Sequence, residues 1–155
     1  MGIAEAGELH KTLLIVEDDI LPAMALRDEL EDAGYRVLDL TVSYQDALAV
    51  AREFPPDLAL VNIQLEGRDD GIALAEVLKA MGVPVLFISG QVSRARSAQS
   101  VAIGSLPKPY SPADMVRAVD YLLRGLDADP TLPPPERLEV FGRTGKAKAP
   151  GPQPA

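Results

Sequence analysis

The sequence predicts a doubly wound α/β domain, in which a five-stranded parallel sheet carries helices on both faces. Two observations support this prediction. Five short apolar segments alternate with segments of helical periodicity, which is the order typical of a parallel sheet with helical connections. The first, third and fourth apolar segments are nearly continuous in Leu, Ile, Val and Ala, as strands are when both faces of the sheet are covered.

The expected strands are residues 12–16, 36–42, 57–63, 83–89 and 101–106. Helices are expected over residues 20–33, 43–54, 72–81, 92–100 and 111–124. The last helix has the clearest start, because Ser111 is a favourable N-cap, Pro112 suits the first helical position and Asp114 favours a helix N-terminus. Ser43 and Asp46 have the spacing of a capping pair, which predicts the start of the second helix.

Composition excludes several classes of function. The chain of 155 residues has a formal charge of −8 and no cysteine, so a disulfide scaffold, a thiolate zinc site and a cysteine nucleophile are excluded. Neutralising nucleic-acid phosphates requires clustered Lys and Arg, so the acidic balance argues against DNA as a partner. No apolar run approaches the roughly 20 residues that span a bilayer, and residues 1–10 lack the features of a signal peptide. We therefore expect a cytoplasmic protein without a membrane partner.

Three regions are expected along the chain: an N-terminal arm over residues 1–10, the α/β domain over residues 11–125, and a proline-rich tail over residues 126–155. The tail contains seven prolines, and its four acidic residues offset its four basic ones. This composition favours disorder. The alternative is that residues 132–141, which contain Leu, Val and Phe, dock on the domain or on a partner.

Polar residues follow the expected strands where each one ends. Residues 17–19 (EDD) follow the first strand, Asn62 lies near the end of the third, Ser89 ends the fourth, and Lys108 follows the fifth. Because parallel strands end at one edge of the sheet, we expect these side chains to meet in one crevice. Acidic oxygens suit a hard cation such as Mg²⁺, and with the hydroxyl and the ammonium they suit a tetrahedral dianion. A cis bond between Lys108 and Pro109 would aim the lysine inward.

Five segments together resemble the receiver domain of bacterial two-component response regulators. They are IVEDD (residues 15–19), PDLALVNIQL (56–65), DGIALAEVL (70–78), VPVLFISG (83–90) and LPKPYSPADMVRAV (106–119). The resemblance covers residues 11–125. It implies a flavodoxin-like sheet with the strand order 2-1-3-4-5.

The resemblance also implies a role for each polar residue of the crevice. Glu17 and Asp18 correspond to the acidic pair that binds Mg²⁺, and the backbone carbonyl of Gln64 corresponds to a further metal ligand. Ser89 corresponds to the hydroxyl residue that bonds the phosphoryl group, and Lys108 to the lysine that pairs with it. Asn62 corresponds to the phosphate-accepting aspartate, which is where this sequence departs from the family.

The amide at position 62 changes the expected chemistry. A carboxylate attacks phosphorus with a full negative charge, whereas an amide oxygen is neutral, so Asn62 should not accept a phosphoryl group. Asn62 is also a member of the implied metal site, and its missing charge should weaken Mg²⁺ binding. The otherwise intact site favours a deliberate substitution over a naturally degenerate receiver, and the sequence leaves both open. Asp69 and Asp70 are disfavoured as substitute acceptors, because a polar loop before a helix explains them.

Three functions are compatible with these features. The first is a single-domain, non-enzymatic receiver of a phosphorelay, with a histidine kinase or phosphotransfer protein as donor and output through a protein partner or homodimer. The second is a phosphorylation-independent pseudo-receiver that binds through the same face. The third, a metal-dependent phosphatase or a flavin protein of this architecture, is disfavoured because Glu17 is the wrong type of nucleophile and no hydroxyl-rich loop follows the first strand.

The resemblance implies a docking face formed by the fourth helix, the fifth strand and the fifth helix. Ser105 replaces the aromatic residue that many receivers carry three positions before the lysine, so we expect coupling through loop movement instead of a rotating ring. The region also carries basic residues, which fit an interaction surface and a solvated face equally: Arg94, Arg96, Arg117 and Arg124.

Overall fold

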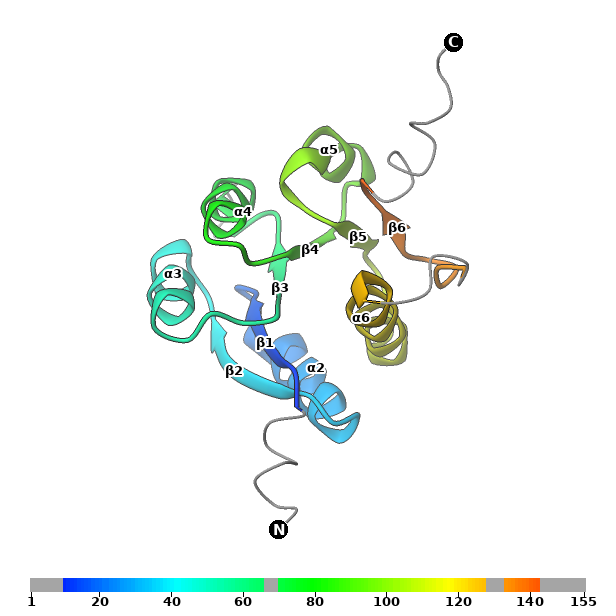
Figure 1. Cartoon of the computed structure of the whole chain (residues 1–155), viewed down its shortest axis with the longest axis horizontal. Helices are drawn as coiled ribbons and strands as arrows, with labels where there is room; N and C mark the ends of the chain where they lie inside the picture. Colours follow the sequence, from blue (N-terminus) through cyan, green and yellow to red (C-terminus); the bar gives the residue numbers. More distant parts are fainter. Residues whose placement is uncertain (1–9, 66–69, 128–132, 143–155) are drawn as a thin grey trace.

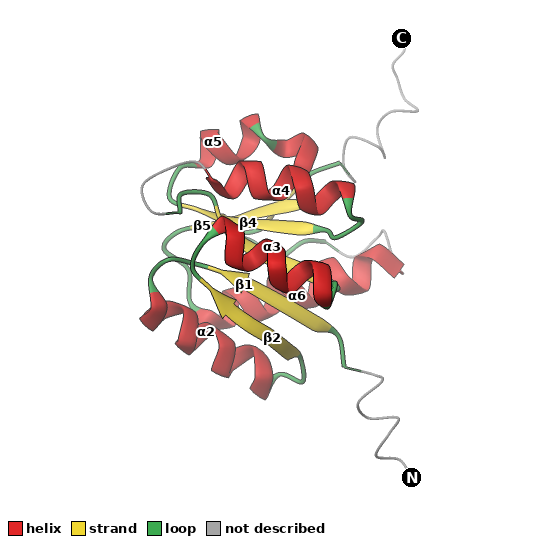
Figure 2. Cartoon of the chain, turned by 90° about the vertical axis from the view of Figure 1, so that its left-hand side faces the viewer, coloured by secondary structure: helices red, strands yellow, loops and turns green. Residues whose placement is uncertain are grey.

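The computed structural model describes residues 10–65, 70–127 and 133–142 of the chain. A sheet with the order β2-β1-β3-β4-β5-β6 forms the middle layer, and helices cover both of its faces (Figures 1 and 2). The parallel strands are β1 (Thr12–Val16), β2 (Arg36–Thr41), β3 (Leu58–Asn62), β4 (Val85–Ser89) and β5 (Gly104–Pro107). The doubly wound fold and the strand order 2-1-3-4-5 are therefore confirmed, with one strand added at the β5 edge.

The helices divide between the two faces of the sheet. Against one face pack α2 (Ile20–Asp32) and α6 (Pro112–Asp127), and against the other pack α3 (Tyr44–Glu53), α4 (Asp70–Ala80) and the short α5 (Val92–Ser97) (Figure 1). Every residue of β3 and β4 is buried, which explains why these strands are nearly continuous apolar runs. Within the described residues, no helix has the length and apolarity of a membrane span.

Two helices begin at their predicted caps. At α3, the Ser43 hydroxyl accepts a hydrogen bond from the backbone N–H of Asp46 (3.2 Å). At α6, the Ser111 hydroxyl accepts from the N–H of Asp114 (3.1 Å), and the Asp114 carboxylate accepts from the N–H of Ser111 (3.0 Å). Such bonds satisfy N–H groups that the first helical turn leaves without partners. They hold the start of α6 directly after the loop that carries Lys108.

Two predicted boundaries around β5 are wrong. The sequence predicts a helix over residues 92–100, but α5 ends at Ser97, whose hydroxyl donates to the carbonyl of Arg94 (2.8 Å). Such local bonds of serine to the backbone compete with helical continuation. The predicted fifth strand begins at residue 101, whereas Gln99–Val101 form a 3-10 turn and β5 begins at Gly104.

The prediction of a disordered tail is wrong for residues 133–142, which we call the strap. Its strand β6 (Glu139–Val140) pairs antiparallel with β5. Leu138 joins the apolar core on the α2–α6 face and Phe141 joins the core on the other face. The docking alternative therefore holds for these residues, because burial of two large apolar side chains offsets the cost of ordering a proline-rich segment. The rest of the predicted tail from residue 128 onward, and residues 1–9 of the arm, lie outside the described residues.

Candidate functional site

The carboxyl ends of four strands converge on one hollow with a volume of about 360 Å³. Its lining consists of Asp18, Asn62, Ile63, Gln64, Ser89, Gly90, Gln91, Arg94 and Lys108. Glu17, which directly follows β1, is buried and contacts both Asn62 and Lys108. The structure therefore brings together every residue that the sequence suggests for the site.

The side-chain amide nitrogen of Asn62 lies among three oxygen atoms. It donates to Glu17 Oε2 (3.1 Å), to Asp18 Oδ1 (3.4 Å) and to the backbone carbonyl of Gln64 (2.9 Å). Asn62 is only 6 % exposed, so these hydrogen bonds are largely shielded from water. The three oxygens are the ones that the sequence suggests as metal ligands. The N–H groups of the amide therefore bond to the same three oxygens that would be the ligands of a cation.

A buried carboxylate and a lysine connect the β1 and β5 sides of the hollow. Lys108 Nζ lies 3.5 Å from Glu17 Oε1. Burial raises the pKa of Glu17 above its ordinary value, while the charge of Lys108 and a hydrogen bond from the N–H of Asp19 (3.2 Å) oppose that rise. The backbone N–H of Lys108 donates to the carbonyl of Ser89 (2.7 Å), and the Lys108–Pro109 bond is cis. These contacts hold the lysine beside the ends of β1 and β4.

The hydroxyl of Ser89 is engaged by the loop that follows β4. It donates to the carbonyl of Gln91 (2.9 Å) and accepts from the N–H of Gln91 (2.8 Å). Gln91 and Arg94 line the hollow, although sequence reasoning assigns Arg94 only to a basic face and passes over Gln91. Their position two and five residues after a strand end was the available signal, since loops after parallel strands line such crevices.

The start of α4 packs against the end of β3. The N–H of Gly71 donates to the carbonyl of Ile63 (2.9 Å), and a Cβ at position 71 would lie 2.6 Å from that same oxygen. Only glycine fits such an approach of two backbones. Asp70 is the first residue of α4 and does not line the hollow. Asp69 lies outside the described residues.

The docking face suggested by the sequence is partly covered. The strap pairs with β5 between α5 and α6, and Ser105 lies opposite Glu139 in this pairing. Glu139 also binds α5, because Arg96 Nε donates to both of its carboxylate oxygens (3.0 and 2.9 Å). Tyr110 lies two residues after Lys108, and burial and the nearby charge of Glu17 raise its pKa to about 12. A partner at this face would therefore meet α5, the strap and α6, with the β5 edge already paired.

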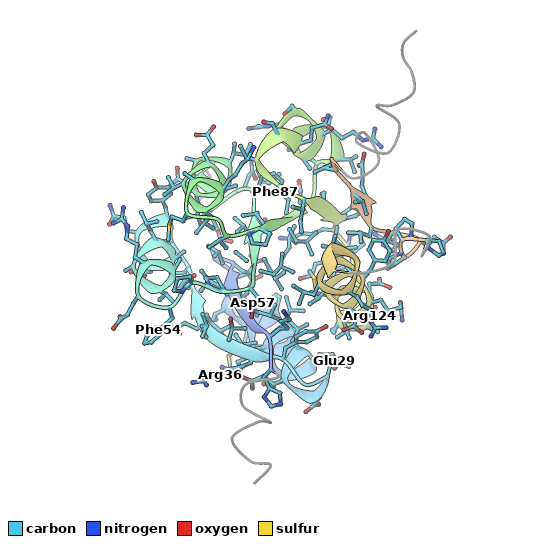
Figure 3. All side chains as sticks on the ribbon, viewed as in Figure 1. Glu29, Arg36, Phe54, Asp57, Phe87 and Arg124 are labelled. Atoms are coloured by element: carbon cyan, nitrogen blue, oxygen red, sulfur yellow. The ribbon has the colours of Figure 1, made fainter. Side chains whose placement is uncertain are left out.

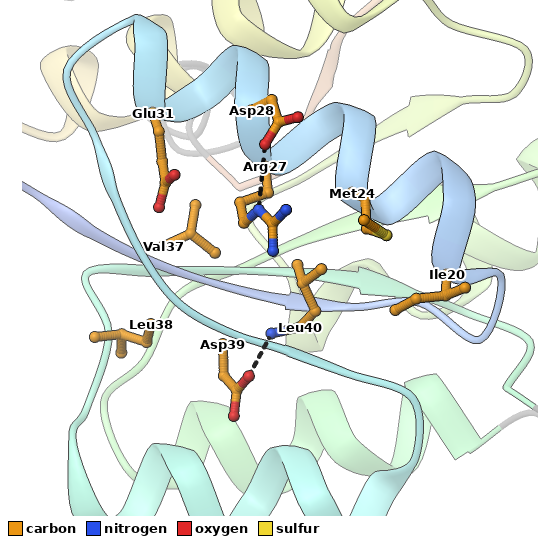
Figure 4. A pocket seen from close by; sticks show the side chains of 9 residues that line it. All are labelled: Ile20, Met24, Arg27, Asp28, Glu31, Val37, Leu38, Asp39 and Leu40. Carbon is orange, nitrogen blue, oxygen red and sulfur yellow. Dashed lines mark hydrogen bonds and ion pairs between the residues drawn. The ribbon is translucent and has the colours of Figure 1, made fainter.

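A second hollow, of about 590 Å³, lies between α2 and β2 (Figure 4). It is lined by Ile20, Met24, Arg27, Asp28, Glu31, Val37, Leu38, Asp39 and Leu40. Within it, Arg27 pairs with the adjacent Asp28 (3.3 Å) and the Asp39 carboxylate accepts from the N–H of Leu40 (2.8 Å). None of the suggested site residues lines this hollow.

A doubly wound parallel sheet with carboxylates, a hydroxyl and a lysine at its carboxyl edge defines a flavodoxin-like protein with an acidic ligand crevice. The family model of the response regulator receiver domain matches residues 13–120, and the chain belongs to this family. The solved signal receiver domain of a modulated diguanylate cyclase from Desulfovibrio desulfuricans is 35 % identical, with a TM-score of 0.66 over 74 % of this chain and 94 % of that chain. A putative response regulator from Chloroflexus aurantiacus is 30 % identical, with a TM-score of 0.66 over 74 % of this chain and 98 % of that chain.

Curated relatives are longer proteins. The transcriptional regulatory protein PdtaR of Mycobacterium tuberculosis is 29 % identical over 115 residues, which cover 71 % of this chain and 55 % of PdtaR. The phyllosphere-induced regulator PhyR of Methylorubrum extorquens is 31 % identical over 121 residues, which cover 76 % of this chain and 45 % of PhyR. The chain thus spans about half the length of these relatives, and the similarity concerns the receiver domain.

Receiver domains of two-component systems generally bind Mg²⁺ at this acidic pocket. In this chain the donor types suit a hard cation, because Glu17, Asp18 and the Gln64 carbonyl offer oxygen atoms. The charge and the local geometry do not suit a cation, because Asn62 is neutral and its N–H groups point at those oxygens. Among the described side chains, no group of three or more His, Cys, Asp or Glu residues could hold a metal ion. In this structure the amide of Asn62 is hydrogen-bonded to the three oxygens of Glu17, Asp18 and Gln64.

Proposed function

We propose that this chain is a receiver in which Asn62 blocks phosphoryl acceptance and whose output is binding to another protein. The supporting observation is the amide nitrogen of Asn62, which donates to Glu17, Asp18 and the Gln64 carbonyl. An amide lacks the negative charge with which a carboxylate attacks phosphorus. The same hydrogen bonds oppose Mg²⁺, which would have to displace the amide and would meet one negative charge fewer, so we propose weak metal binding.

The roles of the other pocket residues follow from their contacts. Lys108 neutralises part of the charge of Glu17, and Ser89 holds the loop after β4 through Gln91. These groups therefore have partners within the protein before any ligand arrives. A pocket satisfied in this way supports one stable arrangement of the surrounding loops.

We further propose that the protein is non-enzymatic, that it is cytoplasmic and that it comes from a bacterium. Its proposed partners are a histidine kinase or phosphotransfer protein, and a downstream protein or second copy bound at the surface of α5, the strap and α6. Support for this surface comes from its exposed charges, since the side chains of Arg96 and Arg117 are 62 % and 61 % exposed. Charged residues at the rim of an interface favour specificity and fast association.

The test compares the wild type with Asn62→Asp. Each is incubated with Mg²⁺ and acetyl phosphate, and phosphoryl transfer is followed by Phos-tag electrophoresis and intact mass spectrometry. We expect no phosphoryl group on the wild type and one on Asn62→Asp, with Lys108→Ala in the Asn62→Asp background as the control that reports on the rest of the pocket. A stably phosphorylated wild type would contradict the proposal.

The second candidate is a phosphorylation-independent pseudo-receiver, which the internally paired Ser89 and Lys108 favour. It predicts that Asn62→Asp also remains unmodified by acetyl phosphate and unchanged by beryllofluoride. The same experiment thus separates a blocked receiver from one whose remaining pocket has lost the chemistry.

A further inference from the structure

We propose that the strap positions Lys108 through Arg137, so that docking of the strap at the β5 edge and the arrangement of the pocket are coupled. This proposal goes beyond the proposed function, because it concerns the unmodified chain with Asn62 and involves no phosphoryl transfer. Arg137 lies in the strap and contacts neither Asn62 nor Ser89 in any hydrogen bond of the described residues. It acts on the pocket only through the backbone around Lys108, so it is a positioning residue.

Arg137 holds the chain on both sides of Lys108. Its Nη2 donates to the carbonyl of Pro109 (2.6 Å) and approaches the carbonyl of Pro107 (3.3 Å). Its Nε lies 4.0 Å from the Asp114 carboxylate at the start of α6. A guanidinium is planar and presents several donors in a fixed arrangement, so it can hold two carbonyls at once. The residue between those two carbonyls is Lys108.

The position of Arg137 is set by contacts of the strap far from the pocket. The neighbouring Leu138 is 6 % exposed, and Phe141 donates its N–H to the carbonyl of Ile103 (2.9 Å). The strand β5 has a glycine where the strap crosses it: a Cβ at Gly104 would lie 2.8 Å from the carbonyl oxygen of Glu139. A side chain at position 104 would clash with the strap, so the glycine in β5 allows the strap to pair there. The strap is thus packed onto the domain, and it places Arg137 beside the loop that contains Lys108.

The connection continues from Lys108 into the pocket. Lys108 pairs with Glu17 (3.5 Å), and Glu17 accepts from Asn62 (3.1 Å). A chain of contacts therefore runs from the strap through Arg137 and the Lys108 loop to the carboxylates. Coupling of two sites is reciprocal, so a change at either end alters the other.

The test measures the accessibility of the Lys108 amine in the full chain. Each protein is labelled with trace acetic anhydride, and the rate at every lysine is determined by peptide mass spectrometry, with Lys79, which donates to the Ser100 carbonyl (2.7 Å), as the internal reference. Arg137→Ala should raise the rate at Lys108 about fivefold, the effect of losing roughly one hydrogen bond that holds the paired arrangement. Arg137→Lys should restore part of the wild-type rate, because it keeps one donor.

Arg117→Ala is the matched control, since Arg117 also pairs with Asp114 (2.7 Å) on the same surface. It should leave the rate at Lys108 unchanged. Leu138→Ala removes a buried apolar contact of the strap. It should also raise the rate at Lys108, because a loosened strap no longer holds Arg137 beside the lysine. Amide exchange at β3 reports whether each variant is folded.

An unchanged rate at Lys108 in folded Arg137→Ala would overturn the proposal, and so would an equal rise in Arg117→Ala. If Arg137→Ala does not fold, the comparison of Arg137→Lys with Leu138→Ala decides in its place: both must exceed the wild-type rate. No phosphodonor is used, so this outcome is independent of the test for phosphoryl acceptance.

Discussion

The strap and the pocket meet at Lys108 but are held by opposite kinds of interaction. The strap docks by burying Leu138 and Phe141 and by pairing its backbone with β5. The pocket instead buries polar groups, and burial raises the pKa of Glu17. Apolar burial stabilises a fold, whereas a buried charge opposes folding unless its partners compensate. Removing an apolar side chain of the strap should therefore lower the free energy of unfolding, whereas neutralising a buried charge of the pocket should raise it.

The largest expected effect is at the strap. Phe141→Ala should lower the free energy of unfolding by about 3 kcal/mol, because it removes a nearly fully buried aromatic side chain. Urea unfolding monitored by circular dichroism measures the change. Phe54→Ala is the matched control, since Phe54 is 58 % exposed and lies at the periphery of the molecule, away from the central Phe87 (Figure 3). An equal, small effect of both substitutions would show that the strap contributes little to stability.

The next effect is on metal affinity in the pocket. Asn62→Asp adds a third negative charge beside Glu17 and Asp18, so the affinity for Mg²⁺ should rise by about tenfold or more. Without Mg²⁺ the same variant should be less stable than the wild type, because it replaces three N–H···O contacts with repulsion between carboxylates. Isothermal titration calorimetry and thermal unfolding measure the two changes.

Asn62→Ala is the control for the metal prediction, because it removes the amide without adding charge. An equal gain in affinity for Asn62→Ala and Asn62→Asp would mean that the amide blocks the site sterically and that its missing charge is secondary.

The fold and the pocket could be predicted because their signals are local or topological. The buried strands β3 and β4 are visible as apolar runs, and Ser111 with Asp114 marks the start of α6. Once the strands are parallel, the residues at their carboxyl ends must lie at one edge. The residues Glu17, Asn62, Ser89 and Lys108 follow from that topology alone.

The sequence offers docking of the strap only as an alternative to disorder, because the stability of the strap depends on distant residues. Its prolines favour disorder locally, and its docking requires the open edge of β5 and the absence of a Cβ at Gly104. Arg137 contacts carbonyls of Pro107 and Pro109, and a backbone acceptor has no signature in the sequence. The direction in which the Asn62 amide points is likewise set by oxygens of the loop after β1 and of the loop after β3.

Glu17→Gln in the pocket should stabilise the protein, in contrast to Phe141→Ala in the strap. The folded state holds the proton of Glu17 more tightly than the unfolded state does, so the unfolding free energy falls as the pH rises above the ordinary pKa of 4.5. Removing this titration should therefore raise the free energy of unfolding at neutral pH. Thermal unfolding between pH 4 and 8 should show a flatter profile for Glu17→Gln, and Glu29→Gln on the exposed side of α2 should leave the profile unchanged. A less stable Glu17→Gln would mean that the pairing with Lys108 outweighs the cost of burial.

The smallest expected effect separates the charges of the strap from its apolar contacts. Arg96 and Glu139 form a two-pronged ion pair, but their side chains are 62 % and 36 % exposed. Exposed pairs of this kind contribute about 0.5 kcal/mol, and salt screens them. A double-mutant cycle with Arg96→Ala and Glu139→Ala, repeated at low and high salt, should therefore give a weak coupling that disappears at high salt. A strong, salt-independent coupling would mean that charged groups hold the strap as they hold the pocket. The strap would then not differ from the pocket in being held by apolar burial.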